Sequence, residues 1–254
     1  MHFSLEQVAD LYAGLDDVRL KATALLQRVV MTAMQTEGGR EHADHGLGRR
    51  LSTLARCIER VFELLPPDLD YVPESDITHD AVINIQAFVM GAFGCCENIA
   101  WIWVYERDIR EGGQLLPANR VGLGPGYRTF RASLTPSFRQ RLDQFTPWFE
   151  NLKNFRDALA HRIPIYIPPF TITPEDGDRY QALEAELQAA LIMRRDIDEY
   201  ERLQAELKAL RHFTPIMRHS FRDASQAIIF HAQLLADFAT IEELAGILLD
   251  ELRL

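Results

Sequence analysis

This sequence of 254 residues is poor in cysteine, and its cysteines lack the spacing of a metal site. Cys57 stands alone, and the neighbours Cys95 and Cys96 cannot easily bridge within a helix. Three cysteines form neither a zinc-type spacing nor an even disulfide framework. We therefore expect reduced thiols, no metal centre, no bound cofactor and a cytoplasmic setting.

The chain also lacks an uncharged run of the length that usually crosses a membrane. The longest stretch without a charge, residues 81–96, has 16 residues, and Glu97 and Asn98 follow it directly. A transmembrane helix needs about 20 apolar residues, so we expect a buried core helix here. The first residues, MHFSLEQVADLYAGL, lack the basic start and apolar centre of a secretory signal and instead predict a helix opened by a capping box at Ser4.

Positive charge is scarce, because the chain has a net charge of −10. That balance argues against a general affinity for nucleic acids or anionic membranes. The charge is uneven, however. Residues 119–162 contain eight Lys or Arg against three acids, a local +5, whereas residues 175–254 contain nine bases against sixteen acids, a local −7.

Alternating strand patterns and internal repeats are missing, and apolar residues recur at helical spacing along nearly the whole chain. We expect helices over 4–36, 48–65, 76–109, 135–162 (with a kink at Pro147), 178–194, 196–213 and 220–238, the last with a restart at Thr240. Residues 37–47 and 112–126 are rich in glycine and predict loops. The sequence thus predicts an all-α fold: an antiparallel helical bundle over 1–170 and a helical C-terminal extension over 171–254 that packs on it.

The stretch NFRDALAHRIPIYIPPF at residues 154–170 carries the candidate chemistry. Prolines at 164, 168 and 169 predict that the helix ends near His161 and that an extended arm follows. Asp157 and His161 are four residues apart, so the carboxylate can orient and charge the imidazole. Arg156 and His161 are about 140° apart around a helix and would flank a groove.

An arginine that holds a phosphate beside a histidine that exchanges a proton suits phosphodiester cleavage without a metal. The ribose 2′-hydroxyl would be the nucleophile, and Arg156 would stabilise charge on the phosphate oxygens. The alternative is structural: Arg156 pairs with an acid of its own helix, and His161 bonds the last helical carbonyls.

The run Arg156-Asp157-Ala-Leu-Ala-His161 resembles the Arg-polar-x-x-x-His signature of the HEPN superfamily, named for higher eukaryote and prokaryote nucleotide-binding proteins. The resemblance covers about residues 76–170. It implies a helical bundle, and in many members a metal-independent endoribonuclease whose paired motifs face each other across a homodimer. Other members bind ligands or partners without catalysis. The toxin subgroup usually carries a tyrosine two residues after the histidine, where this chain has Ile163.

Glu97 lies within the apolar run and needs a cation if it is buried. We expect it to pair with Arg156, so that Glu97 and Asn98 support the motif from behind, together with Asp157 and Asn154. Another arginine could serve equally as the partner. The glycines of residues 122–126 resemble a phosphate loop only in composition and predict a turn.

Three functions stay open, and one of them is a purely structural interaction protein that uses an acidic helical hairpin formed by residues 178–194 and 196–213. The other two use the motif. The first is a nucleotide- or RNA-directed activity, a candidate metal-independent endoribonuclease, with Arg156 and His161 as catalytic residues. The second is a non-catalytic helical protein that binds a small ligand or a partner protein in the same groove.

Overall fold

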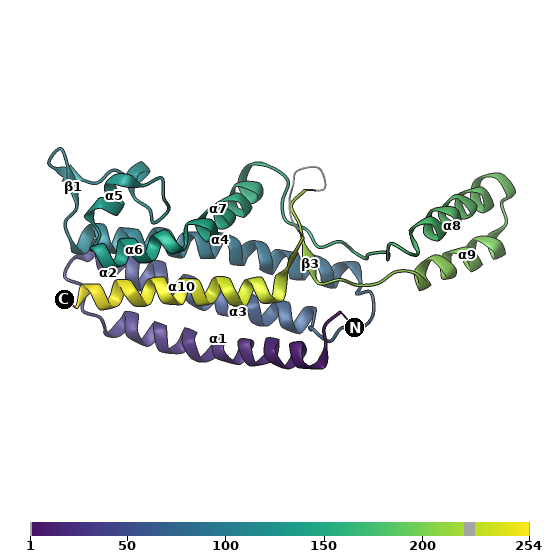
Figure 1. Ribbon diagram of the computed structural model, residues 1–254, viewed down its shortest axis with the longest axis horizontal. Helices are drawn as coiled ribbons and strands as arrows, with labels where there is room; N and C mark the ends of the chain where they lie inside the picture. Colours follow the sequence, from purple (N-terminus) through teal and green to yellow (C-terminus); the bar gives the residue numbers. More distant parts are fainter. Residues whose placement is uncertain (1, 221–226, 254) are drawn as a thin grey trace.

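Four long helices form the body of the molecule in the computed structural model, which describes residues 2–220 and 227–253 (Figure 1). They are α1 (Leu5–Met31), α3 (Arg49–Leu64), α4 (Ser75–Glu106) and α10 (Phe230–Leu252). Together they enclose one continuous apolar core to which all four contribute. The predicted all-α class is therefore confirmed.

The helices do not all alternate in direction. α3 runs antiparallel to α1, as shown by the hydrogen bonds from Tyr12 to Asp68 and from Arg19 to Glu59. α10 runs parallel to α1, because Arg28 near the end of α1 bonds Asp250 near the end of α10. The long connection between α4 and α10 brings the chain back to the far end of the bundle before α10 begins (Figure 1).

Shorter elements fill that connection and the turn between α1 and α3. They are α2 (Glu37–Arg40), η1 (Glu41–Gly48), β1 (Arg110–Glu111), β2 (Gln114–Leu115), η2 (Ala118–Arg120), α5 (Arg128–Ser133), α6 (Pro136–Gln144), α7 (Thr146–His161), α8 (Gly177–Ala189), η3 (Ala190–Arg194), α9 (Ile197–Ala209), β3 (Ile216–Met217) and β4 (Ile228–Ile229). β1 pairs with β2, and β3 with β4, each pair antiparallel.

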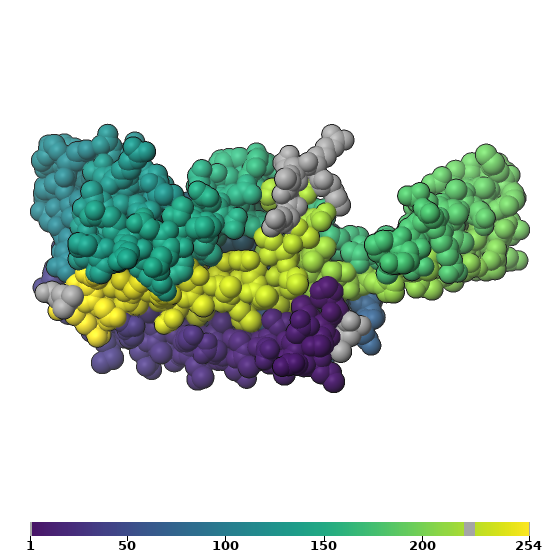
Figure 2. Space-filling view, viewed as in Figure 1, coloured from purple at the N-terminus to yellow at the C-terminus, as the bar shows by residue number. Residues whose placement is uncertain are grey.

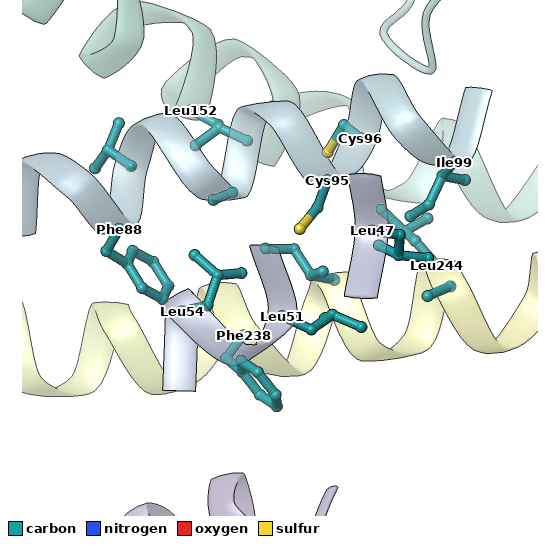
Figure 3. Close-up of a cluster of buried hydrophobic side chains, with 14 of the residues drawn as sticks. Leu47, Leu51, Leu54, Phe88, Cys95, Cys96, Ile99, Leu152, Phe238 and Leu244 are labelled. Carbon is teal, nitrogen blue, oxygen red and sulfur yellow. The ribbon is translucent and has the colours of Figure 1, made fainter. Parts of the chain in front are cut away.

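α4 is the central helix. It is long and apolar enough to cross a membrane, yet 72% of its most apolar 18-residue window is buried inside the fold, as in a core helix. Glycine lets α3 approach closely: a β-carbon at Gly94 would lie 2.3 Å from the guanidinium of Arg50. Figure 3 shows Cys95 on the side of α4 that faces Leu51 and Leu54, with Cys96 on the other side of the ribbon.

Several predicted boundaries hold. The capping box at Ser4 is present, and its side chain accepts a hydrogen bond from the Gln7 amide. α7 ends at His161 as predicted, and the arm after it is extended, pairing through Tyr166 with Arg218. The predicted kink at Pro147 is instead a break at Phe145, and α7 starts at Thr146 with Pro147 in its first turn.

Two predictions about loops and breaks are wrong. Residues 37–48 are helical and continue directly into α3, because Thr36 caps them and glycine lets η1 pack closely on α4. A β-carbon at Gly46 would lie 2.4 Å from the side-chain nitrogen of Asn98. α10 does not restart at Thr240, whose hydroxyl bonds the Ala236 carbonyl inside a continuous helix. Residues 221–226, where we expected the last helix to begin, lie outside the described residues.

The C-terminal extension divides into two parts. α10 completes the bundle, whereas α8 and α9 form a helical hairpin that projects from it on two extended strands of chain (Figures 1 and 2). A bridge between Thr171 and His212 joins those strands. The expectation that the whole extension packs on the bundle is thus wrong for the hairpin.

Candidate functional site

Arg156 is partly buried where α7 crosses α4. Its guanidinium lies over the ring of Phe93, with 4.2 Å from Cζ to the ring centroid, and its Nη1 is 3.0 Å from the Asp157 carboxylate. Its Nε is buried and has no hydrogen-bond partner among the described residues. A buried donor without an acceptor costs about 1–3 kcal/mol, so this nitrogen gains from any acceptor that reaches it.

His161 lies elsewhere, exposed on the last turn of α7. Five residues of helix turn it about 140° from Arg156, so the two side chains leave α7 in different directions. Asp157 does not orient His161 in the described structure. It pairs instead with Arg156 and, at 3.6 Å, with Lys153 one turn earlier.

The prediction of a buried Glu97 paired with Arg156 is wrong. Glu97 is exposed, and it forms no ion pair with any described residue. Its neighbour Asn98 is buried, because successive helical residues point about 100° apart and only Asn98 faces the bundle. The amide oxygen of Asn98 accepts from Arg50 Nε at 3.0 Å, and its nitrogen lies 3.1 Å from His42 Nδ1.

Asn154 connects α7 to the chain around it. Its side-chain oxygen accepts a 2.6 Å hydrogen bond from Arg162, and its nitrogen lies 3.2 Å from His219 Nε2. Of the proposed supporting residues, Asn98 and Asn154 therefore hold elements in place, and neither lines the cavity beside Arg156.

That cavity is a pocket of about 460 Å³ between α4, α7 and the loop of residues 119–127. Its size falls within the range of small-molecule sites, about 300–1,000 Å³. The walls are mainly apolar and the remaining groups polar or charged: Phe93, Cys96, Glu97, Asn119, Val121, Gly122, Leu123, Gly124, Pro125, Gly126, Tyr127, Phe149, Glu150, Leu152, Lys153 and Arg156. The pocket brings Arg156 and Glu97 together, and His161 is not among its residues.

The glycine-rich loop forms one wall by folding over Tyr127. A β-carbon at Gly122 would lie 2.5 Å from the Tyr127 ring, so glycine at this point lets the ring close on the loop. Sequence reasoning interpreted this loop as a turn and missed its role as a wall. The aromatic and apolar residues beside its glycines were the only local signal.

The charges around the pocket do not favour a multiply charged anion. Lys153 and Arg156 both pair with Asp157, whereas neither Glu97 nor Glu150 forms an ion pair with a described residue. The two cations and two carboxylates that line the pocket balance. Asp157, which pairs with both cations from outside the lining, brings the formal charge to −1. Opposite charges are therefore more nearly balanced here than the basic sequence around residues 119–162 suggested.

Cys96 belongs to the apolar wall. Burial, with smaller contributions from Cys95, Glu97 and Asp237, raises the pKa of its thiol well above the usual value. Because the thiolate is the reactive form, a thiol in this setting packs as an apolar group and is a poor nucleophile.

Comparison with known proteins adds no relative. No protein-family model matches the sequence, and neither a curated protein nor a solved structure is significantly similar to it. The described residues also contain no group of three His, Cys, Asp or Glu side chains placed to hold a metal ion.

Proposed function

We propose that the protein binds a small molecule with an apolar or aromatic body in the pocket between α4, α7 and the loop of residues 119–127. The observation that carries this proposal is the pocket itself, which joins apolar walls to a few polar groups in the manner of ligand sites. Phe93 and Tyr127 supply aromatic rings for contact with a flat ligand.

The polar groups indicate the rest of the ligand. Arg156 Nε is a buried donor in need of an acceptor, and Glu97 and Glu150 are acceptors in need of donors. A neutral or zwitterionic molecule offers both kinds of group at once. A phosphate-rich ligand would have to approach the carboxylates of Glu97 and Glu150, and the two cations that would attract it already pair with Asp157.

The ribonuclease hypothesis rests on the motif and needs His161. Within one chain His161 is absent from the pocket, so the binding hypothesis has the stronger support. Cleavage would require His161 of one chain to lie near Arg156 of a second chain, as the family resemblance implies for the paired motifs of a dimer.

Two related fluorescent probes test the ligand chemistry. N-phenyl-1-naphthylamine is neutral, and 8-anilinonaphthalene-1-sulfonate has the same rings with an added sulfonate. We expect the neutral probe to bind the folded protein at one site and more tightly than the sulfonate. Tighter binding of the sulfonate would overturn the charge argument, and no saturable binding of either probe would overturn the proposal.

Two glycine variants locate that binding. Gly126 lines the pocket, and a β-carbon there would meet no other atom within 4 Å. Gly126→Trp should therefore add bulk at the pocket with little strain and abolish probe binding. Gly177→Trp is the matched control, because Gly177 begins α8 and is equally unobstructed. It should bind like the wild type.

His161→Ala separates binding from catalysis. We expect it to bind the neutral probe as the wild type does, since His161 does not line the pocket. A broad RNA panel is then incubated with the wild type and His161→Ala purified identically. Cleavage by the wild type that His161→Ala lowers by about 10²–10⁴ would instead establish the ribonuclease hypothesis.

A further inference from the structure

The hairpin of α8 and α9 has an unusual end. Its two helices pack mainly on each other, with Leu203 and Leu207 buried between them. η3 and the turn into α9 form the tip, which lies at the far end of the molecule from the bundle (Figure 2). The sequence predicted two charged helices here, and their hairpin as one candidate interaction surface, but it did not single out the tip.

The tip exposes large apolar side chains. Ile192 is 72% exposed and Met193 is 83% exposed, and Leu191 and Ile197 are exposed beside them. Arg195 closes the turn in the left-handed conformation, with φ of 55°. Single exposed apolar residues are common, but four gathered at one end of a projecting element indicate a surface that a partner covers.

Charge argues against a membrane as that partner. Residues 175–211 contain ten acids and six bases, a local −4, within a chain of net charge −10. An anionic lipid surface would repel this hairpin. The cations nearest the apolar side chains are Arg194 and Arg195, so a suitable receptor offers an apolar hollow edged by carboxylates.

The pocket between α4 and α7 has that chemistry. Its walls include Val121, Leu123 and Phe149, and Glu97 and Glu150 remain without ion pairs among the described residues. The cations of the lining, Lys153 and Arg156, both pair with Asp157, which leaves the two glutamates as the groups open to an arginine.

At the tip, Arg195 makes no ion pair with a described residue. Arg194 makes a surface pair with Glu199 at 3.2 Å and donates a long hydrogen bond, 3.4 Å, to the Glu186 carbonyl. Surface pairs contribute about 0–1 kcal/mol, so Arg194 can change partners at little cost.

We propose that the hairpin tip of one copy docks in the α4–α7 pocket of a second copy. The tip cannot serve its own pocket, because the hairpin and α5, which follows the pocket loop, lie at opposite ends of the molecule (Figure 1). The inference uses the same pocket as the proposed function and names a protein segment that occupies it. The tip and a small ligand therefore compete.

Reciprocal exchange would give a dimer with two such contacts. Each contact is smaller than a standard interface of about 800 Å² per partner, so one alone is weak. The second contact forms within the same assembly and gains from a high effective concentration. A reversible, concentration-dependent dimer follows.

Sedimentation velocity with complementary variants tests this arrangement. The tip variant Ile192→Asp with Met193→Asp changes only exposed side chains, and Gly126→Trp blocks the pocket. Each variant alone should be monomeric, whereas the wild type dimerises with concentration. An equal mixture of the two variants should form a heterodimer, since one partner retains a tip and the other a pocket. That heterodimer has one contact in place of two, so it should require a higher protein concentration than the wild-type dimer.

Three results would overturn the proposal: a wild type that stays monomeric, a tip variant that dimerises like the wild type, or a mixture that associates no more than either variant alone at the highest concentration reached. Gly177→Trp should dimerise normally. The tip variant also keeps the two proposals distinguishable, because its pocket is open and free of a partner. If the tip variant binds the probe but the wild type does not dimerise, only the ligand site is supported. If the wild type dimerises but the tip variant does not bind the probe, only docking is supported.

Discussion

Asp237 is a buried carboxylate in α10 without a cation beside it in the described structure. Its Oδ1 accepts hydrogen bonds from Trp148 at 2.8 Å and Gln233 at 2.6 Å. Burial raises the pKa of this group to about 6, and the two hydrogen bonds oppose that rise. Because the folded pKa exceeds the unfolded value of about 4, the folded state favours the protonated carboxyl.

Stability linked to Asp237 is therefore fully present below about pH 4 and is lost as pH rises through 6. Asp237→Asn removes the charged form and retains an acceptor oxygen. We expect the Tm of the variant, relative to that of the wild type, to rise from pH 5 to pH 8. The corresponding gain in relative free energy of unfolding is about 1–3 kcal/mol. Asp250→Asn on the same helix is the control: it removes the surface pair with Arg28, so Tm should change by a similar amount at both pH values. A difference independent of pH would contradict the prediction.

Neighbouring residues on α4 show what sequence reasoning could and could not decide. The pattern identified an apolar helix and two polar residues within it, Glu97 and Asn98. It could not decide which of them faces the bundle, because the apolar run leaves no polar side to orient the helix. Tertiary contacts with Arg50 and His42 bury Asn98, and the pocket leaves Glu97 exposed.

Local chemistry decided well where a helix begins or ends. The capping box at Ser4 and the prolines after His161 act within a few residues, so the sequence reports them directly. Residues 37–48 were wrongly predicted as a loop because glycines favour loops locally. There, packing against α4 and the Thr36 cap outweigh propensity.

η1 is held against α4 by Asn98. The side-chain amide of Asn98 lies within hydrogen-bonding distance of both Arg50 and His42. The His42 ring in turn stacks on the ring of Trp101, with centroids 5.7 Å apart. Asn98→Ala should leave the Arg50 Nε without its acceptor and lower the free energy of unfolding by about 2–3 kcal/mol.

Urea denaturation measures this loss as a lower midpoint at unchanged m-value. The matched control is Asn84→Ala on the same helix, where the side chain makes only a local bond to the Asp80 carbonyl. That variant should shift stability by less than about 0.5 kcal/mol. Equal effects of the two substitutions would show that Asn98 does not hold η1.

At the scale of the whole molecule, helix pattern predicted the elements but not their arrangement. The direction of α10 depends on where the connection of residues 107–229 returns, which no local signal encodes. The pocket depends on the same connection, because its three walls come from residues 93–97, 119–127 and 149–156. Periodicity describes one helix at a time, so a site made by three distant segments escapes it.

The fold also predicts that the hairpin and the bundle differ in stability. The bundle encloses a continuous core, whereas α8 contains no buried residue and α9 only Leu203 and Leu207. Helices of 13 residues are marginal without extensive packing, so the hairpin should open without the bundle. Hydrogen exchange by mass spectrometry should show α8 and α9 exchanging far faster than α3 and α4.

A deletion gives the same argument a second test. Replacing residues 177–209 with a short Gly-Ser linker removes the hairpin and keeps the paired strands at Thr171 and His212. Loop-closure entropy changes little for such a replacement, so Tm of the bundle should move by only a few degrees.

Docking of a second copy would protect the tip from hydrogen exchange. Exchange at residues 190–197 should therefore slow as protein concentration rises in the wild type and stay fast in Gly126→Trp. Slow exchange throughout the hairpin at every concentration would mean that contacts within one chain stabilise it.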